Sequence, residues 1–372
     1  MTQRGTTPVL EAFQLDYFKL QKRVFQVLKI LHGDSYCLYR RSLGPGLLVI
    51  IIISLIFNVS YEFKREDIAT YSLIFVGFSQ VLLKSIVLNV YPKEIRELIA
   101  WIGAFHVDST WMNSRHIVRE RFQATLRYFK AVVKFVLVGD ILTVQLMAFL
   151  YFFNGTLLFR IPFVSYLHEN IQFFWQYIAM TYTIFYYAST EFINFFFGFY
   201  FVAILSIYIN SIEKLDDENF VKSSRNHLKD YHHKHLQILQ KLEDFVKIFS
   251  FILNAQAVSY LPLLINTFYN ITIHPDIFIN YLILCSIVTQ LFEICLLGEF
   301  FDSKTTEIFR KLYLTKWYEM SRDDKMILVL MMRMTIKPFS LKAAGIYNIN
   351  MMAFVDVIKF CISFCAILHA MT

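Results

Sequence analysis

The chain has few of the residues that soluble, flexible or cross-linked proteins depend on. Of its 372 residues only 17% are charged, and it contains 11 Gly, 7 Pro and 5 Cys. Low charge with so little Gly and Pro excludes a disordered chain, a collagen-like repeat and long flexible linkers. The chain is instead rich in Phe (39) and Tyr (22), and 56% of its residues are hydrophobic. A soluble chain averages roughly 45–50% apolar and about 25% charged residues, so we expect this protein to fold in a membrane.

Seven stretches are apolar enough to cross a bilayer as helices, which requires ~20 mostly apolar residues. They are Ser42–Tyr61, Ile68–Leu83, Ala131–Phe159, Asn170–Ile212, Ile248–Pro275, Ile277–Phe292 and Ala343–Thr372. In the fourth stretch Glu191 separates two charge-free runs without a turn signal, so we interpret it as one long tilted helix. Residues 1–41 are mixed and charged, and we expect no cleavable signal peptide. The sequence therefore predicts an all-α membrane protein with seven transmembrane helices.

Two signals predict the orientation of these helices. Of the 36 Lys and Arg residues, 32 fall in the N-terminal segment and the three connecting loops that a seven-helix topology places on one side, and cytoplasmic loops carry such an excess. The glycosylation sequons that begin at Asn58, Asn154 and Asn270 all fall at span ends on the opposite side. Both signals predict a cytoplasmic N-terminus and an extracellular C-terminus. This topology excludes a G-protein-coupled receptor, whose N-terminus lies outside.

Signals of catalysis, metal binding and nucleic-acid binding are missing. No Gly-rich phosphate loop, nucleophile elbow, HExxH or CxxC motif occurs, so we expect neither an enzyme nor a cofactor. The one histidine cluster comprises His227, His232, His233 and His235, and we interpret it as a solvated helix face rather than a metal site. The outer loops hold no cysteine pair to bridge. The basic loops already satisfy the orientation rule, so they indicate no nucleic-acid partner.

Three acidic residues lie within predicted spans. Charged groups inside a membrane are costly, so each of the three is a candidate functional residue. Glu191 lies in the middle of the fourth stretch, whereas Asp140 and Glu293 lie nearer to span ends. For these two, contact with interfacial water or a neighbouring helix is the simpler interpretation. A transporter would show internal repeats and helices broken at matching places, and neither is found in the sequence.

The last span carries a polar stripe. Asp356, Lys359 and Ser363 are spaced i, i+3, i+7, and Ile367 and Met371 continue the same face outward. A polar stripe that ends in apolar side chains suits a water-filled path closed by a hydrophobic constriction. An ion pair between Asp356 and Lys359 on a packed helix fits the same spacing. Because no other span carries such a stripe, a pore would need copies of this helix from other subunits.

The outer halves of the spans carry rows of Tyr, Phe, Met and Ile at helical spacing. Helix–helix packing commonly uses such rows, but they also suit an apolar pocket that holds a small volatile ligand with a few hydroxyls. The residues concerned are Tyr71, Ile74, Phe75, Met147, Ala148, Tyr151, Tyr177, Met180, Thr181, Ile184, Phe278, Tyr281 and Cys285.

The C-terminal third contains an ordered set of motifs. These are Gln290, Cys295 and Gly298, then Tyr313-x-x-x-Trp317, Arg333, Lys337-Pro338, Ala344-Gly345, and the ending Phe354…Lys359-x-x-x-Ser363-Phe364. In these motifs the chain resembles the insect odorant receptor family. Weaker likeness reaches back through His235–Phe245 to the fourth span, where Glu191 stands where the family often has Asp. The resemblance covers roughly residues 170–372 by motif and the whole chain by topology.

The resemblance implies an odorant-gated non-selective cation channel, assembled as a heterotetramer of an odorant-specific subunit and a shared co-receptor. It implies a plasma-membrane location in sensory-neuron dendrites. The co-receptor has a long insertion between its fourth and fifth spans, whereas this chain has a short loop there, so it resembles the odorant-specific subunit. The implied parts are a cytoplasmic segment 1–41, helices one to six over 42–298, a cytoplasmic anchor 299–342 and a pore-lining helix 343–372.

The family's pocket lies in the outer half among spans two to six, which favours the apolar rows above as ligand residues. Its hydrophobic gate aligns with Ile367 and Met371. Aromatic walls favour a small aromatic or heterocyclic odorant. The alternative is a gustatory-like or non-conducting chemoreceptor that signals through a cytoplasmic partner.

Overall fold

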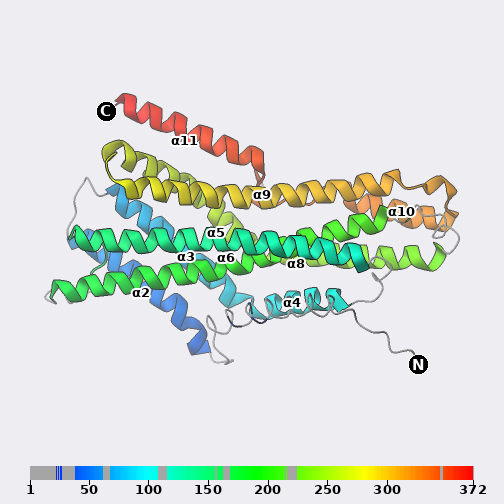
Figure 1. Cartoon of the computed structure of the whole chain (residues 1–372), viewed down its shortest axis with the longest axis horizontal. Helices are drawn as coiled ribbons and strands as arrows, with labels where there is room; N and C mark the ends of the chain where they lie inside the picture. The colour runs from blue at the N-terminus through cyan, green and yellow to red at the C-terminus, as the bar shows by residue number, and fades with distance from the viewer. Residues whose placement is uncertain are drawn as a thin grey trace.

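The long apolar runs of the sequence fold into long α-helices that lie side by side along the longest axis of the molecule (Figure 1). The computed structural model describes residues 22, 24, 26, 38–61, 68–107, 115–155, 157–161, 168–213, 215, 224–343 and 347–371. In chain order the helices are α2 (Leu38–Tyr61), α3 (Ile68–Val90), α4 (Pro92–Val107), α5 (Arg115–Phe153), α6 (Glu169–Glu213), α8 (Ser224–Ile273), α9 (Phe278–Leu314), α10 (Arg322–Thr335) and α11 (Met351–Met371).

Two short elements accompany the helices near the C-terminus. A 3-10 turn, η4 (Trp317–Glu319), joins α9 to α10. The strands β1 (Lys342–Ala343) and β2 (Tyr347–Asn348) pair antiparallel between α10 and α11, with Lys342 opposite Asn348. From this hairpin α11 leaves at an angle to the rest of the bundle, as the red helix in Figure 1 shows.

The predicted all-α membrane architecture is confirmed. Within the described residues, α3, α5, α6, α8 and α9 are each long and apolar enough to cross a membrane, and α2 contributes the shorter apolar stretch Gly44–Ser60. With α11, each of the seven predicted spans overlaps one helix. Because an α-helix rises about 1.5 Å per residue, most of these helices exceed a hydrocarbon core of roughly 30 Å and extend beyond it.

Helix α6 occupies the centre of the bundle. It continues through 45 residues without a break, which confirms that the stretch around Glu191 is one helix. In its C-terminal half, Phe197 and Phe201 pack against Phe245 and Phe249 of α8, with ring centroids 5.5 Å apart for Phe197–Phe249 and 5.3 Å for Phe201–Phe245. Phe301 of α9 extends the cluster at 5.9 Å from Phe245. Part of the phenylalanine excess thus forms an aromatic core that joins three helices.

The predicted third span ends earlier than the sequence suggests. Helix α5 stops at Phe153, and Gly155 adopts a φ of 65°, a left-handed conformation that ends helices and favours glycine. Residues 157–161 are not helical, and the side-chain oxygen of Gln176 accepts hydrogen bonds from the backbone N–H groups of Leu158 (2.6 Å) and Phe159 (3.3 Å). The apolar run to Phe159 therefore includes a non-helical segment that is hydrogen-bonded to α6.

The last helix also differs from its predicted span. It begins at Met351 rather than at Ala343, because Ala343 belongs to the hairpin. The side chain of Asn350 accepts a hydrogen bond from the backbone N–H of Ala353 (2.9 Å), which is the pattern of a helix N-cap. Apolar composition alone could not reveal this cap.

The three sequons differ in exposure. Asn154 is exposed, whereas Asn58 and Asn270 are buried, with 0% and 4% of their surface accessible. The Asn58 amide donates hydrogen bonds to the carbonyl of Leu157 (2.7 Å) and to the Tyr71 hydroxyl (3.3 Å). The Asn58 side chain is therefore a structural link between α2, α3 and residues 157–161.

The four described cysteines, Cys285, Cys295, Cys361 and Cys365, are free thiols, and Cys37 lies outside the described residues.

Helices α9 and α11 approach each other closely near Gly298. A Cβ atom added to this glycine would overlap the backbone carbonyl of Ile349, two residues before α11 begins. The Met351 backbone N–H donates to a carboxylate oxygen of Glu299 (3.4 Å), and the rings of Phe292 and Phe354 lie 5.6 Å apart. The start of α11 is therefore fixed to α9 through backbone as well as side chains.

We expect Gly298→Ala to destabilise the protein, because backbone cannot yield to the new methyl group as a side chain could. Overpacking of this kind costs about 1–3 kcal/mol. The melting temperature of a detergent-solubilised fluorescent fusion measures the effect. The matched control is Gly139→Ala in α5, where an added Cβ meets no atom within 4 Å. Equal melting temperatures for the two variants would show that the contact at Gly298 is not tight.

Candidate ligand-binding site

A cavity of about 190 Å³ lies between α3, α5, α6, α8 and α9. Most of its walls are aliphatic, aromatic or thioether side chains, and a smaller set of lining residues carries polar groups. The residues that line it are Leu73, Ile74, Gly77, Phe78, Gln80, Val81, Asp140, Thr143, Val144, Met147, Met180, Thr183, Ile184, Tyr187, Leu263, Ile283, Ser286, Ile287 and Gln290. Small-molecule sites have this composition, with apolar walls and a few polar groups that fix orientation.

The polar part of the cavity is built around Asp140. One oxygen of its carboxylate accepts hydrogen bonds from the Ser286 hydroxyl and from the Gln290 amide (3.2 Å), and Gln290 also contacts Ser286 at 3.1 Å. Asp140 is only 6% exposed. It lies thirteen residues before α5 ends at Phe153, which is about 20 Å along the helix axis. It lies close after Lys134, where the apolar span of α5 begins, so its predicted place near a span end agrees with the structure, and it is held by the neighbouring helix α9.

A buried ion pair lies next to this polar group. The Lys84 ammonium of α3 donates to the Glu191 carboxylate of α6, and the two residues are 0% and 5% exposed. The Gln256 amide of α8 donates to the same carboxylate oxygen (2.8 Å). The Lys84 nitrogen also lies 4.3 Å from the centroid of the Tyr187 ring, within range of a cation–π interaction. The ion pair and its hydrogen bond from Gln256 thus connect the three helices α3, α6 and α8.

Polar residues that sequence reasoning missed carry much of this arrangement. The spacing of polar residues in the sequence could have identified them, because residues at positions i and i+4 of a helix share one face. Each of four helices contributes one such polar pair. The pairs are Gln80 with Lys84, Tyr187 with Glu191, Gln256 with Tyr260, and Ser286 with Gln290.

The twelve predicted ligand residues and Cys285 separate into several groups. Ile74, Met147, Met180 and Ile184 line the cavity. Phe75, Tyr177, Phe278, Tyr281 and Cys285 are exposed on the outside of the bundle.

The remaining four lie outside the cavity lining. Ala148 is buried elsewhere, and Tyr151 is half-buried. Tyr71 accepts a hydrogen bond from Asn58, and Thr181 accepts one from Gln145. These eight predicted residues and Cys285 do not line this cavity, and their role in ligand binding stays a prediction. In lipid, helix faces toward the bilayer and toward the core are both apolar, so spacing cannot tell them apart.

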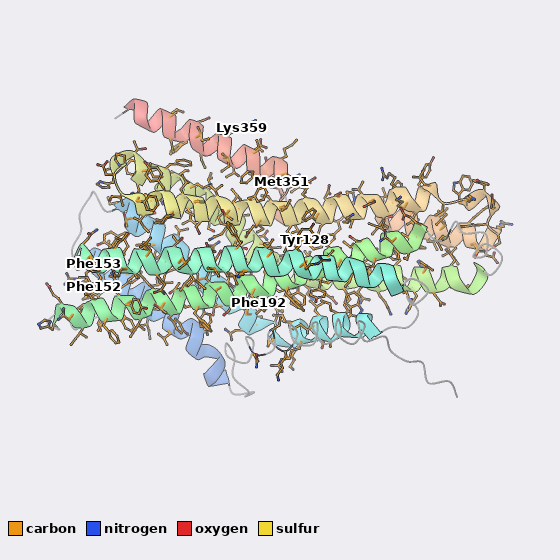
Figure 2. The ribbon with its side chains drawn as sticks, in the orientation of Figure 1. Tyr128, Phe152, Phe153, Phe192, Met351 and Lys359 are labelled. Atoms are coloured by element: carbon orange, nitrogen blue, oxygen red, sulfur yellow. The ribbon has the colours of Figure 1, made fainter. Side chains whose placement is uncertain are left out.

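The predicted pore residues lie on α11. Asp356, Lys359, Ser363 and Ile367 are all exposed, with Lys359 on the part of the helix that leaves the bundle (Figure 2). Within the described part of the chain, neither Asp356 nor Lys359 takes part in an ion pair. The side chain of Met371 lies outside the described residues.

The histidine cluster is only partly solvated. His233 is exposed, but His235 is 1% exposed and its ring lies 5.4 Å from that of Tyr208, so the solvated interpretation was wrong for His235. The side chain of His227 lies outside the described residues. Among the residues that the structure describes, no three His, Cys, Asp or Glu side chains are placed to hold a metal ion.

Comparison with solved structures supports the fold. The chain is similar to the insect olfactory receptor OR5 from Machilis hrabei in complex with eugenol, with a TM-score of 0.80, 14% identity, and coverage of 96% of this chain and 100% of that one. A second OR5 structure matches with a TM-score of 0.77, 15% identity, and coverage of 95% and 99%. No curated protein sequence matches the chain.

The fold and the cavity together define a helical membrane protein that holds a small-molecule cavity among its spans. Residues 66–362 match the family model described as 7tm Odorant receptor, which is most of the chain. The chain therefore belongs to the odorant receptor family, as its motifs indicate, and this family is one of receptors rather than enzymes.

We expect Lys84→Met to lower the free energy of unfolding by about 3–5 kcal/mol, because it leaves the Glu191 charge buried without its partner. The double variant Lys84→Met with Glu191→Gln should recover much of this loss. Thermal unfolding of the detergent-solubilised receptor measures both.

The matched control is Lys311→Met, which breaks the half-exposed pair with Glu213 and should cost only about 0–1 kcal/mol. A loss of stability at Lys311 equal to that at Lys84 would contradict a special role for the buried pair.

Proposed function

We propose that this chain is the odorant-specific subunit of a heteromeric, odorant-gated, non-selective cation channel of the plasma membrane. The observation that carries the proposal is that one helix, α9, both lines the cavity and contacts α11. A small volatile bound in the cavity would touch α9 directly. The similar OR5 structure is in complex with eugenol, which supports a small-molecule ligand for this chain.

The connection between cavity and α11 is short. Ser286, Ile287 and Gln290 of α9 line the cavity, and Phe292, two residues after Gln290, packs edge-on against Phe354 of α11. A ligand shifts a conformational equilibrium only if it binds one state better than the other. In our proposal the odorant binds better when α9 and the attached start of α11 are in the open arrangement.

The exposure of α11 supports a pore made from several chains. Its polar stripe, Asp356, Lys359 and Ser363, is exposed in the single chain, although such groups are costly in lipid. Copies of α11 from neighbouring subunits, including a co-receptor, would surround a common water-filled path. Ile367, further along the same stripe, would then narrow this path as a hydrophobic gate.

Recording from cells tests the proposal. We expect odorants to evoke a cation current when this chain is expressed with an insect odorant co-receptor, and no odorant response from the co-receptor alone. Odorant responses that use a cytoplasmic second messenger and carry no current through the complex would favour the alternative of a non-conducting chemoreceptor.

We expect Ile367→Ser to increase the basal current in the absence of odorant, because a hydroxyl wets the constriction that an isoleucine keeps apolar. The ratio of basal to odorant-evoked current in whole-cell recordings is the measurement.

The matched control is Ile362→Ser, an exposed position of the same helix that lies off the polar stripe. If both variants leave the basal and evoked currents unchanged, α11 does not form the gate.

A further inference from the structure

Two residues that line the cavity each carry a buried polar atom that lacks a partner. The Gln80 side-chain nitrogen and the second carboxylate oxygen of Asp140 form no hydrogen bond, and the two residues are 5% and 6% exposed. Both residues line the same cavity. Buried polar groups in native proteins are nearly always paired, and an unpaired one calls for an explanation such as a missing ligand.

The two atoms have complementary hydrogen-bonding roles. The Gln80 nitrogen is a donor that needs an acceptor, and the Asp140 oxygen is an acceptor that needs a donor. A hydroxyl group supplies both at a single atom. An ether supplies only an acceptor, a protonated amine supplies only donors, and a hydrocarbon supplies neither.

Three hydroxyls that line the cavity are already occupied as donors. Thr143 donates to the carbonyl of Gly139 (2.9 Å) and Thr183 to that of Ala179 (2.8 Å), whereas Ser286 donates to Asp140. The Gln80 side-chain nitrogen, by contrast, has no acceptor.

The volume of the cavity limits the size of the apolar part of the ligand. A cavity of about 150 Å³ lined by apolar side chains holds benzene, and this cavity measures about 190 Å³. Its remaining walls are largely Leu, Ile, Val, Met and Phe. The ligand body is therefore apolar and contains about six to eight carbon atoms, which corresponds to one substituted ring or a short chain.

We propose that the cavity selects small volatile alcohols or phenols, whose hydroxyl accepts a hydrogen bond from Gln80 and donates one to Asp140. This inference rests on the proposed function, since it names the class of odorant that the receptor binds.

A series of four matched probes tests it: 4-methylphenol, its methyl ether 4-methylanisole, the hydrocarbon toluene, and 4-methylbenzylamine. Concentration–response curves are recorded from cells that express the chain with a co-receptor. We expect 4-methylphenol to act at concentrations roughly ten- to a hundredfold lower than its methyl ether, as expected for hydrogen bonds that include a charged acceptor.

Two variants test whether the preference for the phenol over the ether depends on the side chains of Gln80 and Asp140. Gln80→Met removes the donor at similar size, and Asp140→Asn replaces the free acceptor by a donor. We expect each to reduce the preference for the phenol over the ether to about one, while surface labelling and the response to toluene show that the receptor is intact. Gln145→Met is the matched control, because Gln145 lies on α5 outside the cavity lining and should leave the preference unchanged.

Failure of the hydroxyl inference can be distinguished from failure of the proposed function. If the ether, the hydrocarbon or the amine is as potent as the phenol, the hydroxyl inference is wrong, although the chain remains an odorant-gated subunit. The same holds if all four probes are silent while a wider odorant panel evokes current. If no odorant evokes current in cells that carry the complex at their surface, the proposed function itself is contradicted.

Discussion

Lys84 and Glu191 pair in the interior of the bundle, where neither charge can reach water. A charge at such a position is costly in a bilayer, so the pair is stable only if α3 and α6 keep the register that joins them. Gln256 adds α8 to the same point through its hydrogen bond to Glu191. A second polar contact, between Asp140 of α5 and Ser286 of α9, ties the other two helices that enclose the cavity. The packing of apolar side chains fills the space between these contacts, but it does not by itself define which residues meet.

This constraint explains why the cavity has polar and apolar parts. The helices are aligned by buried polar groups, and the residues one or two turns away on the same faces are apolar. Ile184, for example, lines the cavity on the same helix that carries Glu191. A ligand in the cavity therefore lies against the contacts that fix the helix register. Because α9 also holds the start of α11 through Gly298 and Phe292, a small change at the cavity has a direct path to the exposed helix.

The order and type of the long apolar helices could be predicted from the sequence, because length and apolar content decide which segments suit a bilayer. The continuity of α6 could be predicted as well, since no turn signal surrounds Glu191. The lining of the cavity could not. Met180 lines the cavity and Tyr177, one turn earlier, is exposed, yet both belong to the same apolar row. The spacing of polar residues identifies the side of a helix that faces the bundle interior better, as Gln80 and Lys84 on α3 show. The ends of the spans depend on caps such as Asn350, which composition does not reveal.

The central claim is that the cavity between α3, α5, α6, α8 and α9 is the odorant site. A density map of the assembled complex with an activating odorant bound tests it most directly. The account predicts density for the odorant within this cavity, with its polar group beside Gln80 and Asp140 and with α11 next to the corresponding helices of other subunits. An odorant found on the lipid-facing surface or between subunits, with the cavity unchanged, would contradict the account.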